Sequence, residues 1–442
     1  MLALSAPVVM AEVGWVTMGI VDTLMVGRLG PAAIGAVGLA SVLFFAVAIF
    51  AMGLLLGLDP LVARAFGAKR VDECHRWLVA GVWLGVLVAL PFVGAVYLMT
   101  ASLGGWGLPP EVLILARPYL SILTWSLPPL LLYVAFRRYL QAMSVVRPVM
   151  LALVAANLVN AGANWILIFG RLGAPAMGVR GSAYATLAAR VFMAACLFVV
   201  IVRREAHTSP GLRDTPLGLD IRRVRTLMAL GFPAAGQAVL EVGVFAAATA
   251  LAGRVSANAL AAHQIALNMA SVTFMVPLGI ASAAAVRVGQ AIGRHDPRGA
   301  VNAGWTAIVL GVGFMGAAAT AFLTIPSALV RAFTSDGVVV EVGVALLFVA
   351  AAFQLFDGLQ GVTTGALRGL GDTRTAMLWN LAGHWLIGLP LGYMLCFHSD
   401  LGVVGLWWGL STGLMICGVG LILVWLKKAS GLLAQVQESA HG

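Results

Sequence analysis

Twelve long apolar stretches limit what this chain can fold into more than any other feature of its sequence. A membrane-spanning helix needs about 20 mainly apolar residues. The predicted spans are 2–27, 33–58, 76–101, 113–137, 148–170, 178–202, 226–252, 258–285, 299–326, 341–367, 375–397 and 402–426. Only 10% of the residues are charged, whereas soluble domains contain about 25%. The sequence therefore predicts an all-α integral membrane protein with twelve transmembrane helices.

The positive charges indicate how these helices are oriented. Of the 27 Lys and Arg residues, 20, including Arg137 and Arg138, fall in the loops and tail of one side, six fall on the other side, and Arg190 lies inside a predicted helix. Cytoplasmic loops are enriched in Lys and Arg. We therefore expect a multi-pass protein of the bacterial inner membrane with both termini in the cytoplasm. Its net charge of +10 does not indicate a nucleic-acid partner.

The two halves of the sequence resemble each other. With a shift of 226 residues, Pro7 aligns with Pro233 and Gly53 with Gly279, and shifts of 227 and 224 continue the match through each half. Each half has six predicted spans, an even number, so both halves enter the membrane in the same orientation. The repeat predicts two six-helix lobes related by a pseudo-twofold axis along the membrane normal.

The predicted domain organisation follows from this repeat. It consists of an N-terminal lobe, a charged cytoplasmic linker, a C-terminal lobe and a cytoplasmic tail, at residues 1–202, 203–225, 226–428 and 429–442. In transporters of this kind the substrate site lies between the lobes, and alternating access comes from rocking one lobe against the other. Because one chain contains both lobes, we expect that a monomer is sufficient.

Four acidic residues stand out inside the predicted spans: Glu12, Asp22, Glu241 and Asp357. A charged side chain at the bilayer centre costs about 2.5–3.5 kcal/mol on insertion scales, and such residues usually serve ions, protons or substrates. We expect Asp22, Glu241 and Asp357 to bind a coupling H⁺ or Na⁺, with a structural hydrogen bond to a neighbouring helix as the alternative. The role of Glu12, a candidate for the same cavity as Asp22, stays open.

Other polar residues could complete an ion site around Asp22. Asn160 and Asn164 share one helix face because they are four residues apart, and Thr186 lies in the next predicted span. These residues supply oxygen donors from three helices, although hydrogen bonds between packed helices would also explain them. Arg190, a further candidate for the cavity, either pairs with a carboxylate or extends toward the membrane surface.

No motif indicates an enzyme. The sequence has no P-loop, GxSxG, HExxH or EF-hand pattern, and its four Cys residues have neither CxxC nor zinc spacing. We expect no catalytic residues and no cofactor, with Na⁺ or H⁺ as the coupling ion. We expect no cleavable signal peptide, because the first stretch lacks a basic leader. That stretch begins almost at Met1, which leaves open whether the natural chain starts a few residues upstream.

Four local motifs carry more specific information. They are Val21-Asp22-Thr23-Leu24-Met25-Val26-Gly27-Arg28, Leu240-Glu241-Val242-Gly243-Val244-Phe245, Ala261-Ala262-His263-Gln264-Ile265-Ala266-Leu267-Asn268 and Gln354-Leu355-Phe356-Asp357. In combination they resemble the multidrug and toxic compound extrusion (MATE) family, and within it the NorM-like branch. The resemblance covers essentially the whole chain, including the helix number and the repeat.

The resemblance implies an antiporter that exports cationic, amphipathic and aromatic compounds in exchange for Na⁺ or H⁺. Asp22 matches the cation- or proton-binding aspartate of the family's N-terminal lobe. Asn160 and Thr186 match its helix-five asparagine and helix-six hydroxyl, and Asn164 stands where some members have an aspartate.

The resemblance also assigns the acidic residues of the second half. Glu241 and Asp357 match the acidic pair of the C-terminal lobe in the NorM-like branch, a pair that the DinF-like branch generally lacks. Glu12 matches no family position securely.

Two other classes of function were weighed against a drug antiporter. A flippase for lipid-linked saccharides would need a wider cationic cavity and often has two more helices, and a passive channel does not suit a two-lobe repeat with isolated buried carboxylates. The sequence therefore predicts export of small cationic or aromatic drugs by a protein surrounded by membrane lipid. It does not distinguish Na⁺ from H⁺ and does not define the substrates.

Overall fold

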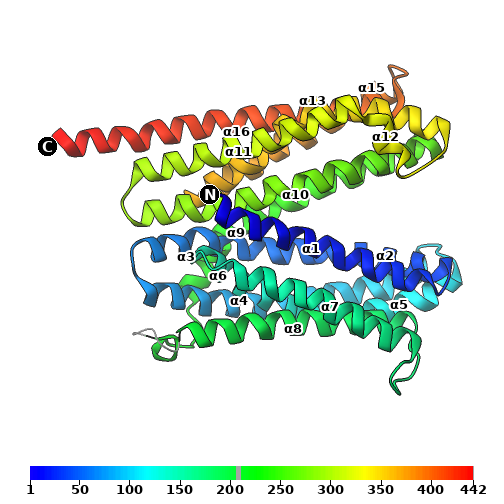
Figure 1. Cartoon of the computed structure of the whole chain (residues 1–442), viewed down its shortest axis with the longest axis horizontal. Coiled ribbons are helices and arrows are strands. Elements are labelled where there is room, and N and C mark those ends of the chain that lie inside the picture. Colours follow the sequence, from blue (N-terminus) through cyan, green and yellow to red (C-terminus); the bar gives the residue numbers. More distant parts are fainter. Residues whose placement is uncertain (206–210, 442) are drawn as a thin grey trace. The chain divides into compact units, whose positions relative to one another are not determined.

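The computed structural model describes residues 1–205 and 211–441, and every regular element in this part of the chain is helical (Figure 1). The helices are α1 (Leu2–Gly27), α2 (Pro31–Leu54), η1 (Leu55–Gly57), α3 (Leu58–Gly67), α4 (Val71–Ser102), η2 (Leu103–Gly105), α5 (Pro110–Thr124), α6 (Leu127–Ala142), α7 (Arg147–Phe169), α8 (Val179–Glu205), η3 (Leu212–Asp214), α9 (Ile221–Val255), α10 (Ala257–Gly293), α11 (Pro297–Thr324), α12 (Pro326–Arg331), α13 (Gly337–Gly369), α14 (Arg374–Asn380), η4 (Leu381–Gly388), α15 (Leu389–Phe397) and α16 (Gly402–His441).

The described helices account for the twelve predicted spans. Ten helical runs are long and apolar enough to cross a membrane, and α5 with α6 makes an eleventh span. The remaining predicted span, 375–397, lies in the continuous helical run α14–η4–α15, whose middle part, Leu381–Gly388, is a π-helix. The predicted fold class is therefore confirmed. Many helices extend beyond the predicted ranges, because their polar ends fall outside an apolar window.

The span predicted at 113–137 is not one straight helix. It consists of α5 and α6, which meet at a bend of 45°. Pro128 and Pro129 follow directly after Leu127, where α6 begins, and proline is tolerated at a helix start because the N–H that it lacks would be unpaired there. Ser126 lies between the two helices, and its side chain contacts a buried arginine described below.

The chain divides into two compact units with borders inside helices. We call Met10–Ala235 the N-terminal unit, and Met1–Val9 with Gly236–Gly442 the C-terminal unit. The border in α1 follows Val9 and the border in α9 follows Ala235, and these positions are separated by the shift of the sequence repeat (235 − 9 = 226). The first turns of α1 and α9 are therefore equivalent parts of the repeat.

The predicted domain limits stay a prediction, and the structure adds detail to them. The predicted linker, 203–225, overlaps the end of α8 and the start of α9, and its residues 206–210 lie outside the described residues. The last helix, α16, continues through the predicted tail to His441, and Figure 1 shows it as one long helix that ends at the C-terminus.

Each unit has an apolar core of its own. The core of the N-terminal unit includes the fully buried side chains of Leu58, Leu131 and Tyr139. The C-terminal unit has two separate clusters. The contribution of α13 to the first cluster ends at Phe353, and its contribution to the second begins at Val362. The stretch of α13 between these residues therefore belongs to neither apolar cluster.

The same close helix contact occurs once in each unit. A Cβ atom added to Gly53 would lie 2.5 Å from Ala235 Cα, within the N-terminal unit. A Cβ atom added to Gly279 would lie 3.0 Å from the backbone nitrogen of Val9, within the C-terminal unit. Gly53 and Gly279 are repeat equivalents, so the repeat conserves a contact that only glycine allows.

We predict that Gly279→Val lowers the thermal stability of the purified protein. Overpacking of a well-packed core costs about 1–3 kcal/mol, and here the added side chain meets backbone atoms. Gly313→Val is the matched control, because a Cβ atom there meets nothing within 4 Å. Melting curves in detergent should show a lower midpoint for Gly279→Val only, and equal midpoints for the two variants would contradict the contact.

Candidate functional site

Asp22 is buried in the N-terminal unit and is held by side chains of two other helices. Its Oδ1 accepts a hydrogen bond of 2.6 Å from Asn164 Nδ2, and its Oδ2 accepts one of 3.1 Å from Thr186 Oγ1. Asn164 Nδ2 also donates to Asn160 Oδ1, at 3.2 Å. The structure thus brings together the four residues predicted to form one constellation, and their part in ion coupling stays a prediction.

The oxygen atoms around Asp22 form a donor set for a small cation. Asn160 and Asn164 lie one turn apart on α7, which places both side chains on the face toward α1 and α8. Asn164 Oδ1 is buried and has no hydrogen-bond partner among the described residues. Hard cations take carboxylate and amide oxygens as ligands, so the carboxylate of Asp22 and this amide oxygen fit such an ion.

Arg190 adopts neither of the two arrangements expected from the sequence. It is 8% exposed, so it does not reach the membrane surface, and within the described chain it forms no ion pair with a carboxylate. Its Nη1 donates a 2.5 Å hydrogen bond to Ser126 Oγ, in the break between α5 and α6. Its guanidinium lies 4.6 Å from the ring centre of Phe44 and 5.9 Å from that of Trp15. Cation–π contacts of this kind stabilise a desolvated cation.

Glu12 forms an ion pair with Arg137, a residue that the sequence analysis placed in a cytoplasmic loop. Arg137 instead lies inside α6 and is 6% exposed, and its Nη2 donates to Glu12 Oε1. Arg138 of the same helix pairs with Asp59 at 3.4 Å. The apolar pattern missed these partners, because Arg137 and Arg138 sit at the polar end of a predicted span. An intramembrane glutamate without a partner was the signal for a buried arginine elsewhere.

Glu241 of α9 and Asp357 of α13 line one cavity of about 240 Å³ in the C-terminal unit. Among the described residues neither carboxylate has an ion-pair partner. The rest of the lining is mostly apolar, with four aromatic rings, Phe245, Phe274, Phe353 and Trp407. The two acidic residues predicted for the second half therefore share a site, and the aromatic rings face the same space.

His263 also lines this cavity, and its hydrogen bonds fix its protonation state. Trp407 Nε1 donates to His263 Nδ1 at 2.9 Å, so Nδ1 must act as an acceptor. His263 Nε2 then carries the proton toward Thr249 Oγ1, at 2.9 Å, and the Thr249 hydroxyl donates to the carbonyl oxygen of Phe245. A neutral imidazole satisfies all three bonds. His263 therefore orients the Trp407 ring, a role that spacing in the sequence did not reveal.

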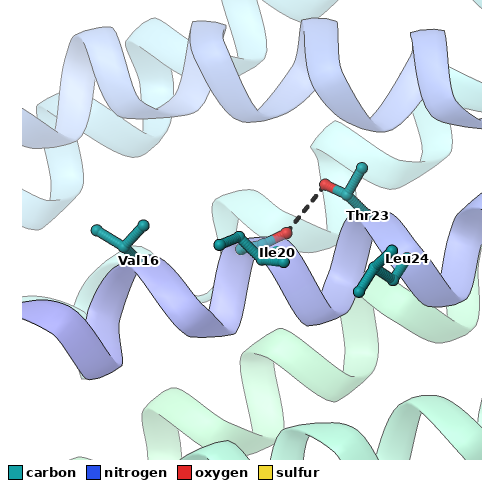
Figure 2. A pocket seen from close by; sticks show the side chains of 5 residues that line it. Val16, Ile20, Thr23 and Leu24 are labelled. Atoms are coloured by element: carbon teal, nitrogen blue, oxygen red, sulfur yellow. Dashed lines mark hydrogen bonds between the residues drawn. The ribbon is translucent and has the colours of Figure 1, made fainter. Parts of the chain in front are cut away.

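A shallow depression lies on the exposed face of α1 within the N-terminal unit (Figure 2). It is lined by Val16, Gly19, Ile20, Thr23 and Leu24. The Thr23 hydroxyl donates to the carbonyl oxygen of Gly19 at 2.9 Å, the bond drawn in Figure 2. The depression contains no charged side chain, so we assign it no ion chemistry.

Comparison with known proteins connects these features to a family. Residues 7–166 and 233–394 match the MatE family model. The two matched segments begin one repeat length apart (233 − 7 = 226). The chain is 37% identical to "Probable multidrug resistance protein NorM" of Mesorhizobium japonicum, over 97% of this chain and 93% of that protein. It is 36% identical to "Multidrug resistance protein NorM" of Burkholderia vietnamiensis, over 98% and 94% of the two chains.

Solved structures share the fold. The eukaryotic MATE transporter AtDTX14 superimposes with a TM-score of 0.86 at 22% identity, over 98% of both chains. A multidrug resistance MATE family transporter in an outward-facing conformation gives a TM-score of 0.86 at 21% identity, over 98% of this chain and 95% of that one. At these identities the likeness concerns the fold alone.

The Glu12–Arg137 pair predicts a specific pattern of stability. Glu12→Gln leaves Arg137 charged and without its partner, and breaking a buried pair costs about 3–5 kcal/mol. The double variant Glu12→Gln with Arg137→Met removes both charges and should regain most of the loss. Melting temperatures in detergent measure this, and a double variant no more stable than the single one would show that Arg137 does not depend on Glu12.

Proposed function

The chain belongs to the MATE family of membrane transporters, and from this we propose that it exports cationic and aromatic drugs in exchange for Na⁺ or H⁺. The observation that carries the proposal is the presence in each unit of buried carboxylates that no Lys or Arg of the described residues pairs with. Asp22 is the one in the N-terminal unit, and Glu241 and Asp357 are those in the C-terminal unit. A membrane-buried carboxylate is costly, and a cation that binds and leaves again accounts for its retention. The names of the relatives support drugs as the cargo.

We assign the Glu241–Asp357 cavity to the coupling cation rather than to the drug. Its volume of about 240 Å³ is below the roughly 300–1,000 Å³ of pockets that enclose drug-sized ligands. Two carboxylates would attract a cation together with a few water molecules, and the aromatic rings would stabilise its charge. In the N-terminal unit, Asp22 with Asn164 and Thr186 would hold Na⁺, or Asp22 would take up a proton.

The coupling follows from competition for negative charge. In the outward-facing state a cation binds at Asp22 or at Glu241 and Asp357, which lowers the affinity for the drug and favours its release. The emptied transporter turns inward, gives up the cation and takes drug from the cytoplasm or the inner leaflet. A cation can shift this equilibrium only by its different affinity for the two states, which a buried carboxylate provides when its access to water changes.

We further propose that the protein works as a monomer in the bacterial inner membrane, with both termini in the cytoplasm. The relatives are bacterial proteins, and the described helices make this a multi-pass membrane protein. Removing Arg137 and Arg138 from the cytoplasmic count leaves 18 positive residues against six (20 − 2 = 18). The charge bias that sets the orientation therefore survives the correction.

We predict that an imposed Na⁺ or H⁺ gradient drives ethidium efflux from cells or vesicles, and that Asp22→Asn reduces this efflux by about tenfold or more, a loss of at least about 1.4 kcal/mol. The amide keeps the size of the side chain and removes its charge. Thr23→Val is the matched control, since Thr23 bonds only within its own helix. Full efflux in well-folded Asp22→Asn would contradict the role of Asp22. Efflux driven by neither gradient would favour a flippase for lipid-linked saccharides.

A further inference from the structure

A line of buried polar side chains continues along α13 from Asp357. Gln360 and Thr364 follow Asp357 by three and seven residues, so the three side chains lie on one face of the helix. Gln360 is 0% exposed, and both polar atoms of its amide lack a hydrogen-bond partner among the described residues. Thr364 Oγ1 is likewise buried without a partner there. The line extends for about 10 Å at 1.5 Å per residue.

Other faces of α13 are packed differently. A Cβ atom on Gly361 would lie 3.0 Å from the ring of Phe274 in α10, and one on Gly358 would lie 2.6 Å from the side chain of Met315 in α11. These faces therefore leave no space for further atoms. The polar line also begins in the part of α13 that belongs to neither apolar core cluster of the unit. Polar chemistry is thus confined to one side of the helix.

The unpartnered groups on this side call for water. A buried polar group without a hydrogen bond costs about 1–3 kcal/mol, and the Gln360 amide alone has two donor hydrogens and an acceptor oxygen. Buried water molecules usually satisfy such groups and need two to four polar partners each. The carboxylate of Asp357, the amide of Gln360 and the hydroxyl of Thr364 supply these partners in sequence. A file of water along this face therefore satisfies all three residues.

We propose that this face of α13 is the hydrated path by which the coupling cation leaves the Glu241–Asp357 cavity toward the cytoplasmic end of the C-terminal unit. The inference rests on the proposed function, because without a coupling ion the path has nothing to carry. It begins at Asp357, passes Gln360 and Thr364, and ends where α13 itself ends, at Gly369. In the predicted topology this end of α13 faces the cytoplasm.

The path explains why these residue types stand at these positions. A chain of water molecules passes a proton from one molecule to the next, and the oxygen atoms of Gln360 and Thr364 replace part of the water shell of a passing Na⁺. An apolar side chain of similar size at either position would exclude water and raise the barrier to release. Such a change leaves Glu241 and Asp357, and therefore the cavity itself, in place.

Two transport assays on the full-length protein in proteoliposomes separate release of the cation from movement of the drug. Gradient-driven ethidium efflux requires the cation to bind and leave in every cycle. Ethidium counterflow without an ion gradient requires only drug-loaded states to change conformation. We expect Gln360→Leu and Thr364→Val to lower gradient-driven efflux by about tenfold, as a barrier increase of about 1.4 kcal/mol would, and to leave counterflow close to the wild-type rate. The conservative variants Gln360→Asn and Thr364→Ser should keep both activities.

Each other outcome has a definite meaning. Unchanged gradient-driven efflux in both apolar variants would overturn the path. An equal loss of efflux and counterflow would also overturn it, because this pattern indicates a packing defect. If the wild-type protein coupled efflux to neither gradient, the proposed function would fail and the path with it. If Asp357→Asn kept full coupled efflux while Gln360→Leu lost it, only the assignment of Asp357 as the start of the path would be wrong.

Discussion

The low-dielectric interior of a membrane protein gives a buried carboxylate few stable environments, and the structure uses two of them. Glu12 is neutralised by Arg137, so its charge is permanently compensated. Asp22 is held instead by the neutral side chains of Asn164 and Thr186, which stabilise a charge without cancelling it. Glu241 and Asp357 share an aromatic cavity that is suited to an exchangeable cation. The distinction between permanent and exchangeable compensation separates structural acids from those that we assign to transport.

The repeat supplies one fold twice, but the two units place their acids differently. The position equivalent to Asp22 in the second half is Ala248, and the position equivalent to Glu241 in the first half is Trp15 (22 + 226 = 248; 241 − 226 = 15). Trp15 instead lies beneath the guanidinium of Arg190. Duplication thus preserved the helix contacts of Gly53 and Gly279, while the polar interior of each unit diverged. Two non-equivalent cation sites in one transporter follow directly from this divergence.

Local sequence patterns predicted the features that depend on short spacings. Apolar runs located the twelve spans, and the four-residue spacing of Asn160 and Asn164 placed both on one face toward Asp22. Contacts between distant segments were beyond such patterns. The Glu12–Arg137 pair joins residues 125 positions apart, and the prediction had ended its helix at Arg137.

The structure also contains features that hydropathy does not encode. The π-helical turn at Leu381–Gly388 is as apolar as the rest of its span. The bend between α5 and α6 was marked in the sequence by Pro128 and Pro129, although a window of apolar residues passes over them. Gln360 and Thr364 are ordinary polar residues in the sequence, and only their complete burial without partners distinguishes them.

The central claim is that drug and coupling cation compete for the same buried negative charge. The most direct test is to add ethidium to the purified transporter in weakly buffered detergent solution and to measure released H⁺ and Na⁺ together with drug binding. The account predicts that bound drug displaces a cation, and that the amount released falls in Asp22→Asn and in Glu241→Gln with Asp357→Asn. Saturable ethidium binding without release of either cation would contradict it.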